Sequence, residues 1–102
     1  MDFKFPYKGY NSDDLIRKCG YGKWFDRQHD NLSYTRKLGA GNYPRFHVYL
    51  KDSEDYFEVS LHLDQKQASY IKGKAHSGEY DGPQVEDEAR RITAQIAKIY
   101  GM

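Results

Sequence analysis

Three histidines and one aspartate are the residues of this chain whose types and spacing best suit chemistry. His62 and Asp64 alternate along one extended segment, so their side chains share a face. His47 lies on the preceding extended segment, and a turn at residues 52–55 places it opposite or diagonal to His62 on that face. Imidazoles about 5 to 8 Å apart can share a divalent metal ion, with Asp64, His76, Glu79 or Asp81 as further ligands. No spacing in the chain is itself a metal-binding signature, so convergence of these side chains stays an open question.

A second segment of interest is the loop at residues 76–82. It holds one histidine, one serine, two carboxylates and two glycines. Glycine lets a ligand approach the backbone closely, and imidazole titrates near neutral pH, so His76 and Glu79 are candidate contact residues. The same loop can instead serve the fold, because Asp81 stands where a helix cap is needed and Tyr80 can anchor the chain. Both interpretations remain open.

Cations and aromatic rings interleave on the sheet face that carries the histidines. Arg45, Tyr49 and Lys51 alternate on one strand, and Tyr56 begins the next. Single-stranded nucleic acids are bound in this way, since rings stack on bases while cations meet phosphates. Tyrosine is also enriched at protein interfaces, and Glu58 on the same face favours a mixed, specific partner. The candidate partner-binding residues are Arg45, His47, Tyr49, Tyr56, His62, His76 and Glu79.

These observations give two hypotheses of function. The first is a non-enzymatic module, with no metal or cofactor, that engages a protein or nucleic-acid partner through the open sheet face and the 76–82 loop. The second is a small metal- or His-dependent enzyme acting on a small molecule and centred on His47, His62, Asp64 and His76. An enzyme or metal site requires its histidines to converge in a concavity, whereas a binding face spreads them over an open surface.

The elements that position these residues are those of an α+β fold. Residues 83–100 form the long C-terminal helix, because apolar residues recur at spacings of four, three, four and three: Val85, Ala89, Ile92, Ile96 and Ile99. Asp81 stands before it in a capping position, and the acidic residues 86–88 suit the positive end of its dipole. The strands at residues 45–51 and 56–63 alternate, which gives a shared core face of Phe46, Val48, Leu50, Phe57, Val59, Leu61 and Leu63. We expect the helix to cover that face while the opposite face stays wet.

The remaining elements have weaker patterns. Residues 32–38 are expected to form a third strand with Leu32, Tyr34 and Leu38 toward the core, and residues 68–72 a fourth. Residues 12–19 are expected to form a short helix that Ser12 caps and Gly20 ends. The predicted order is therefore αβββα-like, with three or four antiparallel strands. Residues 1–31 are expected to be less regular, with Trp24 and Phe25 anchoring this segment to the core.

Composition limits the class of protein. A chain of 102 residues, 38% hydrophobic and 16% aromatic, suits one folded domain spanning residues 1–102. Residues 1–51 carry ten Lys or Arg against five Asp or Glu, and residues 52–102 carry six against ten. The overall pI near 7.8 means that a polyanion site would have to be local. One cysteine, and no apolar run longer than three residues, predict a cytoplasmic protein without disulfides or a membrane partner.

Two resemblances are visible in the sequence. The strings at residues 62–66 (HLDQK) and 75–82 (AHSGEYDG), with the acidic helix start, resemble a family of small prokaryotic proteins that has no activity to carry over. That resemblance covers residues from about 45 to 95, and it implies the type of domain but no catalytic residues. The αβββα order also resembles the double-stranded-RNA-binding domain, which has a Lys-rich segment where this chain has Glu86-Asp-Glu88, so RNA binding is not implied.

Overall fold

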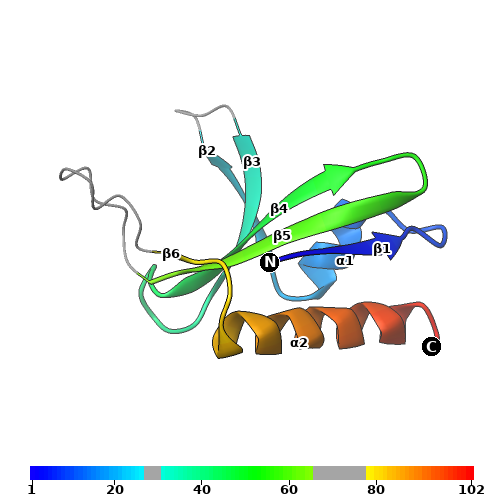
Figure 1. Ribbon diagram of the computed structural model, residues 1–102. Coiled ribbons are helices and arrows are strands. Elements are labelled where there is room, and N and C mark those ends of the chain that lie inside the picture. Colours follow the sequence, from blue (N-terminus) through cyan, green and yellow to red (C-terminus); the bar gives the residue numbers. More distant parts are fainter. Residues whose placement is uncertain (27–30, 66–77) are drawn as a thin grey trace.

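The α+β class is confirmed by the structure, a computed structural model that describes residues 1–26, 31–65 and 78–102. A long C-terminal helix lies against one side of an antiparallel sheet, with a short helix beside it (Figure 1). In chain order the elements are β1 (Asp2–Pro6), α1 (Ser12–Lys18), β2 (Gly22–Asp26), β3 (Asn31–Lys37), β4 (Arg45–Asp52), β5 (Tyr56–Asp64), β6 (Gly78–Glu79) and α2 (Pro83–Ile99).

The sheet contains more strands than the three or four expected. Its order is β1-β5-β4-β3-β2, and the two-residue β6 pairs with the end of β5. The additional strands β1 and β2 lie at the two edges and belong to residues 1–31, which were expected to be less regular. Each has only five residues, and glycines or prolines border them. Each is therefore too short for a strand pattern to be identified from the sequence. The expected strand at 68–72 lies outside the described residues.

The central hairpin has the predicted register. His47 is directly opposite His62, and Arg45 is opposite Asp64. Because side chains alternate along a strand, the histidines and Asp64 lie on one face of the sheet and the apolar residues on the other. The core between this apolar face and the helices contains, as predicted, Phe46, Val48, Phe57, Val59, Leu61 and Leu63 together with Val85, Ile92 and Ile96 of α2. Leu15, Ile16, Tyr21 and Tyr34 complete it on the α1 side.

The expectation that Trp24 and Phe25 anchor the chain to the core is wrong, as is the core position expected for Leu32. Trp24 is 41% exposed and Phe25 52% exposed, and Leu32 is also exposed although it shares the core-side parity of the buried Tyr34. Phe25 and Leu32 are cross-strand partners, and Figure 1 shows the end of β2 and the start of β3 curling away from the helices, so this pair lies beyond the core. Trp24 lies on the other face of the sheet, next to His47.

Both helices begin differently from the expectation. Asn11, not Ser12, caps α1, because its side chain accepts a hydrogen bond from the Asp14 amide. The Ser12 hydroxyl instead donates to Asp52 at 2.7 Å. The cap position of α2 is Gly82, with φ at +116° and no side-chain hydrogen bond, so Asp81 does not cap this helix.

A buried carboxylate ties α2 to the rest of the fold. Glu88 is 4% exposed, and Arg91 grips both of its oxygens at 2.7 and 2.9 Å. The Tyr21 hydroxyl donates to it at 2.5 Å, and Arg36 of β3 lies 3.6 Å away. Burial, with the hydrogen bond to Glu88, raises the pKa of Tyr21 well above its usual range, so the phenol remains a donor. The Glu88 carboxylate therefore connects α2 with β3 and with the segment that precedes β2.

Neither α1 nor α2 meets the length and hydropathy that a membrane-crossing helix needs, and no other helix occurs in the described part of the chain.

Candidate functional site

His47, His62 and Asp64 converge on the sheet face opposite the helices. Nδ1 of His47 lies 3.0 Å from one Asp64 oxygen, and Nε2 of His62 lies 2.9 Å from the other. One donor atom from each of the three residues lies within 4.8 Å of the other two. The central hairpin produces this geometry, since His47 and His62 are cross-strand partners and Asp64 follows two residues after His62 on the same face.

Aromatic rings surround the two imidazoles. Tyr49 stacks on His47 with ring centroids 4.7 Å apart, and Trp24 of β2 meets His47 edge-on at 6.1 Å. The ring of Tyr80 lies 5.2 Å from that of His62. His47 is only 5% exposed as a result. The expectation of a wet face is therefore wrong around the histidines, because the unpredicted strand β2 and the residue after β6 both contribute rings there.

Asp64 is an ionised carboxylate in this setting. Its partial burial works to raise its pKa, but hydrogen bonds and attraction from His47 and His62 outweigh burial and hold that pKa well below its usual range. Nε of Arg45 lies 3.4 Å from the Asp64 oxygen that also faces His47. The Arg45 guanidinium is in turn 4.6 Å from the Tyr43 ring centroid and 5.4 Å from that of Trp24, so its position is fixed from two sides.

One nitrogen of the cluster is unsatisfied. Nε2 of His47 is buried and has no hydrogen-bond partner within the described ranges 1–26, 31–65 and 78–102. A buried polar atom without a partner costs free energy, which a bound ligand or a reorientation of the imidazole would recover. Such an unsatisfied atom is expected where the protein groups are arranged to bind a ligand.

A hollow of about 400 Å³ adjoins His62. Tyr49, Ser60 and Tyr80 line it next to the imidazole. Its size lies at the lower end of the range for small-molecule sites, roughly 300 to 1,000 Å³. A small ligand placed there would touch His62 from the side of the hollow.

The other predicted site residues have varied positions. Arg45 and Tyr49 belong to the cluster, as described above. Tyr56 does not, because it lies six positions before His62 along β5, about 20 Å of extended chain, and Lys4 lies over its ring. His76 lies outside the described residues. Glu79 pairs through its backbone with Leu63, and Gly78 with Asp64, so the end of the 76–82 loop runs beside the cluster.

Sequence reasoning missed three aromatic residues of this site: Trp24, Tyr43 and Tyr80. Trp24 stands in a Gly-Lys-Trp-Phe-Asp segment, where two adjacent aromatic residues are flanked by charged ones. No period-two pattern marks this segment as a strand or assigns Trp24 to a face. Tyr43 and Tyr80 lie in loops, where no periodicity reports the direction of a side chain.

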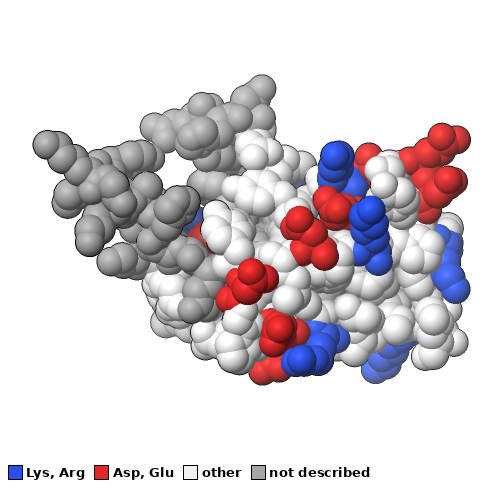
Figure 2. All heavy atoms as spheres, in the orientation of Figure 1, with Lys and Arg blue, Asp and Glu red and all other residues white. Residues whose placement is uncertain are grey.

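Charge on the drawn surface is mixed. Figure 2 shows Lys and Arg interspersed with Asp and Glu on this side of the molecule, without a continuous basic area among the residues it colours. A nucleic-acid-binding surface requires a continuous basic area that meets the phosphates, and the residues coloured in this view do not form one.

Comparison with known proteins gives no relative: no family model, no curated protein and no solved structure matches this chain.

Proposed function

We propose that the protein is a small metal-binding domain whose site is formed by His47, His62 and Asp64. The single observation that carries this proposal is the convergence of two imidazole nitrogens on the two oxygens of one ionised carboxylate. Convergence is what distinguishes the second sequence hypothesis, the metal- or His-dependent enzyme, from a partner-binding face. It favours the metal site over the open binding module.

The donor types and distances suit a borderline-soft divalent cation such as Zn²⁺. Two ligands of a tetrahedral zinc ion, each about 2.0 to 2.2 Å from the metal, lie about 3.4 Å from one another. The nitrogen–oxygen distances of 2.9 and 3.0 Å at Asp64 are close to that value. Small movements of the side chains, and loss of the protons that now join them, would admit the ion.

The number of donors supports an accessible metal rather than a purely structural one. The described part of the chain offers three ligands at this point, and catalytic zinc sites characteristically use three protein ligands plus one open position. The hollow beside His62 provides room for a small molecule next to one of the three ligands. Metal-assisted chemistry on a small substrate is the activity that such a site would support.

Arg45 works against a cation at this site, since its guanidinium lies 3.4 Å from Asp64. The same contact also orients the carboxylate, as outer groups commonly do around metal ligands. We therefore expect moderate affinity, with Arg45 shifting away from the shared oxygen when metal binds.

Thermal denaturation with and without metal tests the proposal. Melting is compared in EDTA and in added Zn²⁺, Mn²⁺ or Ni²⁺. Metal at 100 times its Kd stabilises the folded chain by about 2.7 kcal/mol, which is on the order of 10 °C for a domain of this size. We expect such a rise with one metal at pH 7.5, and its loss in acid, because only a deprotonated imidazole nitrogen can bind a metal ion.

Matched variants make this test specific. Within each variant the readout is the difference between melting with and without metal, so any direct loss of stability cancels. His62→Ala and Asp64→Asn should abolish the difference, and His29→Ala, which changes a histidine outside the proposed ligand set, should retain it. An equal rise in all four proteins, or no rise in the wild type, contradicts the proposal.

A further inference from the structure

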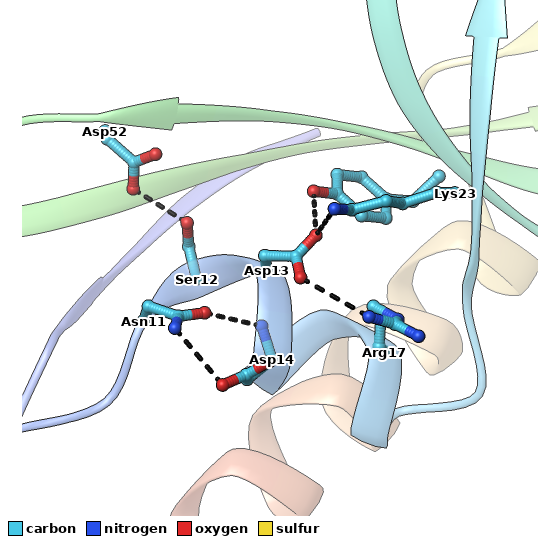
Figure 3. A network of polar contacts seen from close by, with 8 residues as sticks. Asn11, Ser12, Asp13, Asp14, Arg17, Lys23 and Asp52 are labelled. Atoms are coloured by element: carbon cyan, nitrogen blue, oxygen red, sulfur yellow. Dashed lines mark hydrogen bonds and ion pairs between the residues drawn. The ribbon is translucent and has the colours of Figure 1, made fainter.

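A second hollow lies on the other side of the sheet, away from the histidines. It has a volume of about 780 Å³ and is formed by α1, the β2–β3 hairpin and the end of β4. Figure 3 shows its polar wall, where Asp13 and Lys23 face each other and Asp52 approaches Ser12. The metal-site proposal makes no use of this hollow.

Hydroxyl groups in this wall are already committed as donors. Ser12 donates to one Asp52 oxygen at 2.7 Å. The Tyr7 hydroxyl lies 3.0 Å from the same oxygen and 2.7 Å from the Ser53 carbonyl, so its one proton is shared between these two acceptors. Tyr34 donates to Asp13 at 2.6 Å. Each hydroxyl has one proton to give, so the hydroxyls offer a ligand mainly acceptor oxygens, and the ammonium donors of the wall are those of Lys23, beside Asp13. A ligand that binds at the Asp52 end of the wall must therefore bring donors.

The two carboxylates differ in how far their charge is compensated. Asp13 has Lys23 at 3.0 Å and Arg17 at 3.7 Å (Figure 3). Asp52 receives only neutral donors: among residues 1–26, 31–65 and 78–102 no cation lies within ion-pair distance of it, and its second oxygen has no hydrogen bond. Asp52 is thus the acceptor with spare charge.

An apolar surface continues from the carboxylates. Leu50 and Leu32 line the hollow, and Leu32 is 44% exposed. Phe25 is the cross-strand partner of Leu32 and is 52% exposed. Exposed large apolar side chains that adjoin a concave polar site are typical of ligand-binding surfaces.

We infer that this hollow binds a primary ammonium or guanidinium group carried on an apolar stem, with Asp52 as its counter-ion and Leu32 and Leu50 against the stem. The cation supplies donors to the second oxygen of Asp52, which receives none from the described residues. The stem covers the apolar surface that folding leaves open. A free amine and a Lys or Arg side chain of a peptide share this chemistry.

Amide chemical shifts in NMR titrations test the inference with two matched pairs of probes. The first pair is 4-phenylbutylamine and the neutral 4-phenylbutan-1-ol. The second is acetyl-Leu-Arg-amide and its neutral citrulline analogue. We expect each cation to bind saturably, with shifts at residues lining the hollow, and to bind about tenfold or more tightly than its neutral partner, because a charge-assisted hydrogen bond is lost. The two cations are then compared with each other. Tighter binding of 4-phenylbutylamine identifies the ligand as a free amine, and tighter binding of acetyl-Leu-Arg-amide identifies it as a peptide side chain.

Two variants assign the effect to the counter-ion. Asp52→Asn retains an oxygen that can accept from Tyr7 and Ser12 but removes the charge, so it should weaken cation binding about tenfold or more. Asp55→Asn removes an exposed charge from the same turn and should leave affinity unchanged. Unaltered affinity in Asp52→Asn, equal binding of the neutral probes, or no saturable shift up to about 10 mM overturns the inference.

Discussion

Replacing Ile92 with aspartate is expected to abolish cooperative folding. Ile92 is completely buried at the centre of α2, in the core shared with β5. An unpaired charge there costs several kcal/mol, in addition to the lost apolar contacts, which is comparable with a total stability of about 5 to 15 kcal/mol. The measurement is thermal denaturation followed by circular dichroism at far- and near-ultraviolet wavelengths.

Leu61→Asp, from the sheet side of the same interface, should have the same effect, since Leu61 is 1% exposed. Gln95→Asp supplies the control, because it places the same charge on the exposed side of α2. The control should melt within a few degrees of the wild type. If Ile92→Asp also retained a cooperative transition at that temperature, the assignment of the core face would be incorrect.

Removing the Glu88 carboxylate should produce the second largest loss of stability. Glu88→Ala leaves Arg91 and Tyr21 without their buried partner. Breaking a buried ion pair on one side typically costs about 3 to 5 kcal/mol, which lowers Tm by more than about 10 °C in a domain of this size. Denaturant unfolding at pH 7 measures the free energy directly.

Two further variants identify the cause. Glu88→Gln keeps the shape and an acceptor for Tyr21 but leaves Arg91 uncompensated, so we expect most of the same loss. Glu86→Ala removes an exposed acid from the first turn of the same helix and should cost less than about 1 kcal/mol. Equal losses in Glu86→Ala and Glu88→Ala would mean that helix-dipole charge, rather than the buried network, accounts for the effect.

Glu88 also illustrates what the sequence could and could not predict. We expected it to be one of three acidic residues at the positive end of the helix dipole. Its spacing of three from Val85 and four to Ile92 nevertheless places it on the apolar stripe. That spacing was a usable signal. The identity of its partners was not, because Tyr21, Arg36 and Arg91 belong to separate segments that only the tertiary fold brings together.

The fold was predictable where one pattern extended over many residues. The α2 stripe and the β4–β5 alternation gave the correct helix, register and core face. The five-residue strands β1 and β2 were missed because five positions are too few to distinguish the residue pattern of a strand from that of a loop. β2 mattered most, since its Trp24 closes over His47.

The sequence predicted that His47, His62 and Asp64 share one face of the sheet, but it did not predict that their side chains meet. Period-two alternation placed His47, His62 and Asp64 on one face, and the hairpin turn set their register. Rotamers decide whether such side chains meet or point apart, and the neighbouring rings of Trp24 and Tyr49 are what confine them here. Those rings come from a strand the sequence did not reveal and from a tyrosine expected to bind a partner.

Anomalous diffraction from crystals grown with one equivalent of Zn²⁺ tests whether His47, His62 and Asp64 bind one metal ion. We expect one dominant peak at the zinc edge, about 2.0 to 2.2 Å from a nitrogen of His47, a nitrogen of His62 and an oxygen of Asp64. Zinc bound only at other positions, with the 2.9 and 3.0 Å contacts of Asp64 to the two imidazoles intact, would contradict this expectation.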